Sequence, residues 1–350
     1  MSEPAARLRR GARGGPALVA VAVLAAAILA GVSIGETPIP PSVVFQTLAN
    51  RLFEAGYALD AIDAGIVWNY RLTRAIVAAC CGAGLAISGV VLQSLLRNAL
   101  ADPYILGISA GASTGAVAVT IAGLGAGMLS LSLGAFAGAL LAFAMVVALA
   151  RAAGAGPGPG ASGQIVLAGI AGSQLFNALT SFVIAKSANS DQARGIMFWL
   201  MGNLSGVRWH DVWLAVPVAI LGVAVCIWHA RALDAFTFGT ESAASLGVPV
   251  RRVQAVLIAT AALMTAVMVS MVGSIGFVGL VVPHAARFLV GVRHVRLVPA
   301  SALMGAVFLI GCDVLSRTLI HGQVLPIGVI TALAGAPVFA LIMIRARRPQ

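Results

Sequence analysis

The chain has 350 residues, of which 60% are hydrophobic and 9% are charged, and its mean hydropathy is +1.01. This composition excludes an ordinary soluble protein, because soluble domains carry about 25% charged residues. The net charge of +11 indicates attraction to anionic lipid headgroups, and we do not expect nucleic-acid binding.

Apolar runs of about 20 residues, the length that crosses a bilayer, recur along the whole chain. They predict an all-α, polytopic membrane protein with about ten transmembrane helices, several of them broken, in a single domain over residues 1–350. The expected spans are 17–36, 72–94, 103–124, 128–150, 164–186, 209–230, 251–272, 275–292, 298–318 and 326–345. The 40 glycines allow such helices to pack closely where no hydrophobic force acts between them.

The first apolar run follows basic residues, as the apolar core of a secretory signal does. The run 16–34 is nevertheless long for a signal peptide and has no clear cleavage site before Glu36, so we expect it to remain as the first span. With the N-terminus inside, ten spans place 15 of the 22 Arg and Lys residues on the inner side and 7 on the outer side. The positive-inside rule favours this orientation, with both termini cytoplasmic.

Three connections between the spans differ in composition. Residues 37–70 predict an outer segment with a short surface helix, and residues 187–208 predict a polar outer loop. Residues 152–163 are rich in Gly and Pro and predict a flexible inner linker.

The longest inner connection is 232–250, which reads ALDAFTFGTESAASLGVPV. Thr240 or Ser242 is expected to cap a short helix there, and Gly247 and Pro249 are expected to end it. From the residues alone, an element that contacts a soluble partner and an ordinary surface loop explain the segment equally well.

The apolar sequence from Gly273 to Pro337 is repeatedly interrupted by Gly, Pro and isolated polar residues. Polar groups at membrane depth are kept where they face a protein interior or a pathway, so this region is typical of a transporter. Asp313 and Arg317 are four residues apart and predict an ion pair on one helix face. His284 is expected to brace the helix that Pro283 interrupts.

The sequence contains no nucleotide-binding motif. Its only lysine, Lys186, is not preceded by the glycine-rich loop of a Walker A motif. The cysteines lie in apolar runs without metal-ligand spacing and are expected to be reduced packing residues: Cys80, Cys81, Cys226 and Cys312. We therefore predict no catalytic residue, metal site or cofactor, and the chain is not expected to be an enzyme.

Five segments carry distinctive motifs in order along the chain. They are RLTRAIVAACCGAGLAISGVVLQSLLRNALADPYILGISAGAS at 71–113, MFWLMGNLSG at 197–206, FGTESAASLGV at 238–248, GSIGFVGLVVPHAARFLVG at 273–291 and CDVLSR…LPIGVITALAGAPVF at 312–339. Together they resemble the FecCD-type permease family, the membrane subunits of type II ABC importers for iron-siderophores, haem and cobalamin. Thr73 and Ala99 depart from the family pattern, which usually has proline at both positions.

The resemblance implies the type II ABC importer permease architecture in the bacterial cytoplasmic (inner) membrane. It further implies a homodimer that works with two ATPase subunits and a periplasmic or lipid-anchored substrate-binding protein. The residues that match the family's coupling segment are Gly239, Glu241, Ala244, Leu246 and Gly247. Those that match its cytoplasmic gate are Asn98, Ala99, Leu100, Ser162 and Gly163. Those that match the sites of binding-protein docking are Arg71, Arg74 and Arg317, for which snorkelling at the membrane interface is the alternative.

The leading hypothesis is therefore uptake of a large iron chelate, a siderophore or haem, and the alternative within the family is cobalamin. An ion-coupled secondary transporter would need carboxylates at mid-depth, for which Asp313 is the single candidate. A membrane-embedded enzyme is the weakest hypothesis, because the sequence shows no HExxH motif, paired carboxylates or Ser/His/Asp set.

Overall fold

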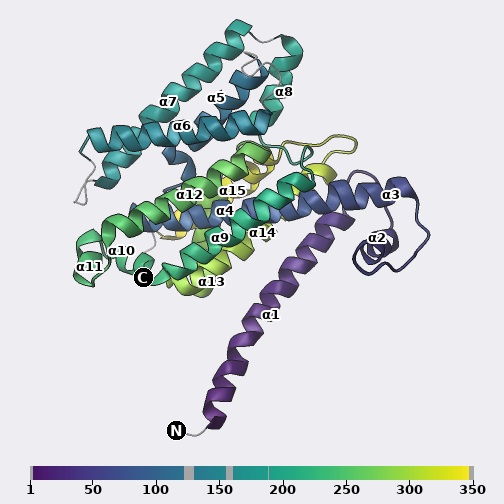
Figure 1. Ribbon diagram of the computed structural model, residues 1–350, viewed down its shortest axis with the longest axis horizontal. Coiled ribbons are helices and arrows are strands. Elements are labelled where there is room, and N and C mark those ends of the chain that lie inside the picture. The colour runs from purple at the N-terminus through teal and green to yellow at the C-terminus, as the bar shows by residue number, and fades with distance from the viewer. Residues whose placement is uncertain (1–2, 122–129, 155–160, 188, 347–350) are drawn as a thin grey trace.

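The computed structural model describes residues 3–121, 130–154, 161–187 and 189–346, which consist of helices and connecting turns without a strand (Figure 1). In chain order the helices are α1 (Glu3–Ser33), α2 (Pro41–Phe53), α3 (Ala61–Ile66), the π-helix η1 (Val67–Leu72), α4 (Thr73–Leu95), the 3₁₀-helix η2 (Pro103–Leu106), α5 (Ile108–Thr120), α6 (Leu131–Ala152), α7 (Ala161–Ser187), α8 (Ser190–Leu200), α9 (Trp209–Trp228), α10 (Ala230–Phe236), α11 (Thr240–Ser245), α12 (Val250–Val272), α13 (Val278–Val290), α14 (His294–Thr318) and α15 (Ile327–Ala346).

Ten apolar helical stretches in the described residues overlap the ten expected spans. Six are long and apolar enough to cross a membrane: Ala61–Leu95, Leu131–Ala152, Gly163–Lys186, Trp209–Trp228, Val250–Val272 and His294–Thr318. Four are shorter: Ala17–Ser33, Ile108–Thr120, Val278–Val290 and Ile327–Leu341. The all-α, polytopic fold is thus confirmed.

The described residues also form more helices than the ten expected, because polar connections fold as well. The segment 37–70 holds α2 and α3, and α3 runs through η1 into α4 without a break, so the second span starts earlier than residue 72. The segment 187–208, expected to be a loop, contains α8. A capping box starts α8, in which Asn189 and Gln192 each accept a hydrogen bond from the other's backbone N–H. Half of the predicted linker 152–163, residues 155–160, lies outside the described part, whereas Ala152 ends α6 and residues 161–163 start α7.

Helix α4 lies at the centre of the molecule (Figure 1). Of its 23 residues, 20 are buried, whereas only 28% of the most apolar window of α9 is buried. Helices α9, α12, α13 and α14 all pack against it. In a helix surrounded by protein, every polar group must find its partner inside the protein.

Glycines let the neighbouring backbones approach α4 closely. A β-carbon built on Gly89 would lie 1.9 Å from the carbonyl oxygen of Gly279 in α13, and one built on Gly82 would lie 2.0 Å from that of Gly305 in α14. Such contacts are impossible for any other residue, so these glycines set the distance between the helices.

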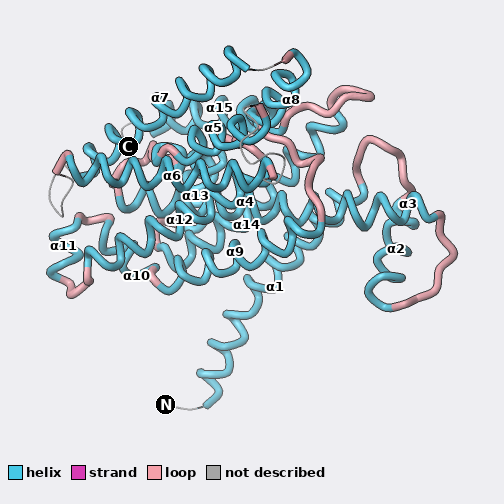
Figure 2. Tube along the Cα trace, turned by 45° about the horizontal axis from the view of Figure 1, so that its top comes forward, coloured by secondary structure: helices cyan, strands magenta, loops and turns pink. Residues whose placement is uncertain are grey.

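The remaining helices surround this centre unevenly. Helices α5, α6 and α7 pack on one another and, with α8, form the upper group in Figure 1. Helix α1 contacts α14 and α4, and its N-terminal end projects from the bundle in both views (Figures 1 and 2). Helices α10 and α11 lie at one end of the bundle and α2 and α3 at the opposite end, which we call the α11 end and the α3 end.

The close contact at Gly89 gives a direct test of the packing. We expect Gly89→Ala to destabilise the protein by about 1–3 kcal/mol, because the added methyl group overlaps the Gly279 carbonyl. Thermal unfolding of the purified protein in detergent measures the effect. The control is Gly65→Ala in α3, where nothing lies within 4 Å and a helical alanine is favoured over glycine. Equal melting temperatures for the two variants would contradict the packing.

Candidate functional site

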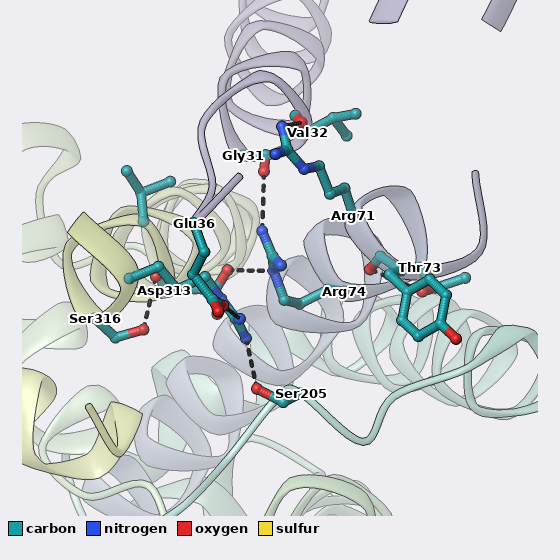
Figure 3. Close-up of polar contacts among 12 residues, drawn as sticks. Gly31, Val32, Glu36, Arg71, Thr73, Arg74, Ser205, Asp313 and Ser316 are labelled. Atoms are coloured by element: carbon teal, nitrogen blue, oxygen red, sulfur yellow. Dashed lines mark hydrogen bonds and ion pairs between the residues drawn. The ribbon is translucent and has the colours of Figure 1, made fainter. Parts of the chain in front are cut away.

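The α3 end is held by a buried ion-pair network around Asp313 (Figure 3). Its Oδ2 lies 2.7 Å from Nε of Arg74, and its Oδ1 lies 3.1 Å from Nε of Arg317. Arg317 also pairs with Glu36, with 2.6 Å between Nη1 and Oε1, and donates to Oγ of Ser205 at 3.0 Å. The predicted pair of Asp313 and Arg317 is therefore confirmed, and it belongs to a larger network that joins α4 and α14 to the segment after α1.

Arg71 ties the C-terminal end of α1 to η1. Its Nη1 donates to the carbonyl oxygens of Val32 and Ser33 at 3.2 and 3.0 Å, and its Nη2 donates to that of Thr37. The last carbonyls of a helix lack partners within the helix, and a cation there also interacts favourably with the helix dipole. Arg71 thus fixes the place where the chain leaves α1.

These contacts correct one expectation. Arg71, Arg74 and Arg317 were expected to be charges on the rim, but they are only 3%, 7% and 6% exposed. Both proposed roles, docking and snorkelling, assumed side chains that reach solvent. Their guanidinium groups are instead used within the chain, and docking remains a prediction.

At the α11 end, the turn after α4 carries three of the predicted gate residues. The backbone N–H of Asn98 donates to the Gln93 carbonyl at 3.2 Å, and the side chain of Asn98 accepts from the N–H of Leu100 at 2.9 Å. Ala99 and Leu100 are exposed. The turn is therefore ordered by local hydrogen bonds and presents small and apolar side chains.

Asp102 follows this turn and caps η2, where its carboxylate accepts from the N–H of Tyr104 at 2.9 Å. Burial raises the pKa of Asp102 to about 6, and the hydrogen bond from Tyr104 opposes that rise. The charged cap is thus retained at neutral pH and is lost in mild acid.

The other two predicted gate residues are not in a loop. Ser162 and Gly163 lie in the first turn of α7, which begins at Ala161. The side chain of Ser162 is outside the described part, and Gly163 is exposed with nothing near it. Their role in a gate remains a prediction.

The expected short helix in 232–250 is present as α11; it ends before Gly247 as expected, but its N-terminal cap differs from the one expected. Gly239 occupies the N-cap position at φ +107°, and neither Thr240 nor Ser242 caps the helix with its side chain. Gly247, at φ +80°, follows the helix, where its N–H donates to the Ala244 carbonyl. Both glycines adopt backbone angles that other residues rarely take, so they define the two ends of α11.

The middle of α11 presents one face to solvent. Ala243 is buried against the bundle, whereas Glu241 and Ala244 are exposed. Leu246, just after the helix, is 71% exposed. An exposed acidic and apolar surface on a short helix at the end of the bundle is available to a partner.

A cavity of about 800 Å³ opens beside α10 and the turn that leads into α11. Its lining comes from α4, the following turn, α10, α13 and the start of α14: Gln93, Ser94, Arg97, Ala99, Asp234, Thr237, Phe238, His284, Arg287, Val292, Arg293 and His294. Two chains of hydrogen bonds run through this lining.

The first chain joins Asp234 of α10, His294 of α14 and Ser94 of α4. Asp234 Oδ1 lies 2.7 Å from His294 Nδ1, and His294 Nε2 lies 2.7 Å from Ser94 Oγ. This Ser/His/Asp set could not be recognised in the sequence, because Asp234 and Ser94 are 60 and 200 residues away from His294. Ser94 is 5% exposed and also donates to the Val90 carbonyl, so its hydroxyl is placed to join helices and not to attack a substrate.

The second chain uses the carbonyl that Pro283 leaves free. Proline has no N–H, so the Gly279 carbonyl four residues earlier lacks its helical partner. Gln93 Nε2 of α4 donates to it at 3.1 Å, and Gln93 Oε1 accepts from Arg287 Nη1 at 2.7 Å. This side chain thus restores the lost bond and ties α13 to α4.

The helix α13 continues through Pro283, contrary to the expectation of a break. His284 Nδ1 lies 2.8 Å from the Leu280 carbonyl one turn earlier, and its ring meets Phe339 of α15 edge-on at 6.0 Å. These contacts agree with the bracing role expected for His284. Among the described residues, no group of three His, Cys, Asp or Glu side chains is placed to hold a metal ion.

The chain matches the FecCD transport family over residues 23–345. An uncharacterized ABC transporter permease, YvrB of Bacillus subtilis, is 39% identical over 332 residues, which cover 95% of this chain and 94% of the relative. The cobalamin import permease BtuC of Halobacterium salinarum is 40% identical over 278 residues, 79% of this chain and 73% of the relative. The vitamin B12 import permease BtuC of Escherichia coli O9:H4 is 38% identical over 282 residues, 81% and 84% of the two chains.

Two solved structures resemble the fold. An inward-facing metal-chelate type ABC transporter aligns with a TM-score of 0.79 at 27% identity, over 94% of this chain and 98% of the other. PsaBC of Streptococcus pneumoniae aligns with a TM-score of 0.53 at 20% identity, over 80% and 93% of the chains, and supports the fold alone.

The network at the α3 end predicts a large effect of one substitution. Asp313→Asn should destabilise the protein by about 3–5 kcal/mol, because it leaves Arg74 and Arg317 buried without their shared carboxylate. Glu36→Gln is the matched control, since the Glu36 side chain is 45% exposed and exposed pairs contribute about 0–1 kcal/mol. Denaturation of both variants in detergent measures the loss in the free energy of unfolding for each. A loss for Asp313→Asn no greater than that for Glu36→Gln would contradict the central role of Asp313.

Proposed function

The chain belongs to the FecCD transport family, and from that premise we propose that it carries a bulky metal chelate into the cytoplasm as the permease of an ABC importer. The observation that supports this most is the family match over residues 23–345, together with ten apolar helical stretches in the described residues. The likeness to a metal-chelate type transporter along 94% of the chain supports the same reading.

We infer that ATP hydrolysis belongs to a separate subunit, since the chain has no Walker A motif. The expected assembly is a homodimer with two ATPase subunits and a periplasmic or lipid-anchored substrate-binding protein, embedded in membrane lipid. In this proposal the α11 end faces the cytoplasm and the α3 end faces outward. The positive-inside rule assigns the side with more arginines to the cytoplasm, and the connections at the α11 end carry more of them.

The coupling role belongs to α11 and its flanking glycines. Glu241, Ala244, Leu246 and Gly247 are exposed, and the buried Gly239 starts the helix that carries them. An exposed short helix at the cytoplasmic end is suited to fit a cleft of the ATPase. The gate role belongs to the turn at Asn98, Ala99 and Leu100, which is continuous with α4, and to Ser162 and Gly163 at the start of α7.

Two substrate classes remain in the proposal. Iron chelates, as siderophore or haem, are the first class, and cobalamin is the alternative. Relatives named for cobalamin or vitamin B12 import, at 38–40% identity, support cobalamin as strongly. Both classes are rigid metal chelates, which suits a pathway that opens widely and binds its cargo weakly.

An ion-coupled secondary transporter is less well supported. Its candidate carboxylate, Asp313, is engaged by Arg74 and Arg317. A carboxylate whose two oxygens are each held by an arginine is not free to bind a transported cation.

Reconstitution tests the function. Proteoliposomes that contain the chain, its ATPase and its binding protein should accumulate cobalamin, haem or a ferric siderophore. They should do so only when ATP is present on the side of the membrane where the ATPase lies. The purified chain should hydrolyse no ATP by itself. Uptake driven by an ion gradient without the ATPase, or intrinsic ATPase activity of the purified chain, would contradict the proposal.

Substitutions in α11 test coupling. Glu241→Lys or Leu246→Asp should leave folding intact, because both side chains are exposed, and should uncouple ATP hydrolysis from uptake. Glu54→Lys at the α3 end is the matched control, as it makes the same charge change at an exposed site. Normal uptake with normal stimulation of the ATPase in the α11 variants would show that α11 has no role in coupling.

A test of docking at the α3 end must take into account that its arginines are buried. A carboxylate of the binding protein would have to compete with Glu36 for Arg317. Glu36→Gln should therefore raise the association rate at low salt, and Arg317→Gln should lower it. Stopped-flow measurement of binding-protein association against salt distinguishes these effects. Equal rates for wild type and both variants would assign docking to other groups.

A further inference from the structure

The cavity at the α11 end carries an excess of positive charge. Its lining contains Arg97, Arg287 and Arg293 against one carboxylate, Asp234. One oxygen of that carboxylate already accepts from both the backbone N–H and Nδ1 of His294, at 2.9 and 2.7 Å. Within the described part of the chain, Arg97 and Arg293 form no ion pair, so both remain available to an anion.

Apolar side chains stand beside these arginines. Phe238 and Val292 line the same cavity and are 75% and 70% exposed. Exposed aromatic side chains next to arginine are enriched where proteins bind other proteins. The combination is unsuited to a small inorganic anion and fits a protein segment.

Arg97 has an unusual backbone conformation for a residue other than glycine. Arg97 ends α4 at φ +50°, a left-handed conformation that glycine would adopt more easily. A β-carbon built on Gly239 would lie 3.4 Å from Arg97 Nη1, so the guanidinium group lies against the start of α11. The arginine side chain therefore sits between the turn with Ala99 and the α11 helix.

The floor of the cavity connects to α4. Ser94 and Gln93, which line the cavity, belong to the last turn of α4 and are hydrogen-bonded to His294 and Arg287. An occupant of the cavity would therefore contact side chains of α4 itself, the helix that leads into the turn at Asn98.

We propose that this cavity receives an acidic side chain of the ATPase subunit, which pairs with Arg97 and Arg293 while its neighbours pack on Phe238 and Val292. The inference rests on the proposed function and adds a second contact to α11. With about 800 Å³, the cavity has room for a carboxylate and the turn of chain that carries it. The partner is chosen over a lipid headgroup because Thr237 and Phe238, which line the cavity, belong to the turn that leads into α11.

The test measures binding of the purified ATPase subunit to the full-length permease in phosphatidylcholine nanodiscs over a range of salt concentrations. The double reversal Arg97→Glu with Arg293→Glu should weaken binding at low salt by about tenfold or more and reduce its salt dependence. Arg151→Glu is the matched control, an exposed arginine at the end of α6 that does not line the cavity. It should change the affinity less than about twofold.

A charge swap identifies the partner group. Acidic residues of the ATPase are changed singly to Lys, and one of these variants should restore binding to the doubly reversed permease while it weakens binding to the wild type. If the double reversal fails to give a monodisperse protein, Arg97→Gln with Arg293→Gln replaces it, with a smaller loss expected.

Several results would overturn the proposal. They are unchanged affinity in the double variant, an equal loss in the Arg151→Glu control, and the absence of any restoring swap. A loss that occurs only in nanodiscs with added phosphatidylglycerol would assign the cavity to an anionic headgroup and also overturn it. Failure of the wild-type chain to bind the ATPase at all would instead reject the proposed function.

Discussion

The burial of α4 is the constraint on which the rest of the structure depends. A helix surrounded by other helices in an apolar medium gains little from hydrophobic association, so close contact and satisfied polar groups must hold it. Glycine contacts at Gly82 and Gly89 supply the first, since they bring the backbones of α14 and α13 against α4. Polar side chains at its two ends supply the second.

The two ends of α4 use different chemistry. At the α3 end, Arg74 shares the buried carboxylate of Asp313 with Arg317. Removing Asp313 takes the shared carboxylate from two buried arginines, so the network favours a single arrangement. At the α11 end, Gln93 and Ser94 make neutral or singly charged hydrogen bonds to α13 and α14. These bonds cost less to rearrange, which suits the end of α4 where the proposed gate and the proposed partner surface lie.

Proline in α13 shows how a local defect becomes a tertiary contact. Pro283 frees the Gly279 carbonyl, and the close approach at Gly89 brings α4 near enough for Gln93 to bind it. The defect and the glycine are therefore parts of one arrangement. Gln93 and Arg287, which take part in this arrangement, also line the basic cavity at the α11 end. A partner bound at the proposed surface would therefore contact residues that are hydrogen-bonded within α4 and α13.

Sequence alone was enough to predict the ten apolar segments, the short helix that ends at Gly247, and the pair of Asp313 with Arg317, although it named Thr240 or Ser242 where Gly239 caps the helix. Each of these depends on residues close together in the chain, through run length, glycine position or spacing along one helix face. Hydropathy runs also made 187–208 look like a loop, because α8 is a polar-capped helix too short to register as a span. Only the tertiary structure decided that Arg71, Arg74 and Arg317 are buried, and that Ser94, His294 and Asp234 meet. Helices that are apolar on all sides carry no periodic signal of which face meets which neighbour. That choice is made by packing between residues tens to hundreds of positions apart, and it places every polar partner described above.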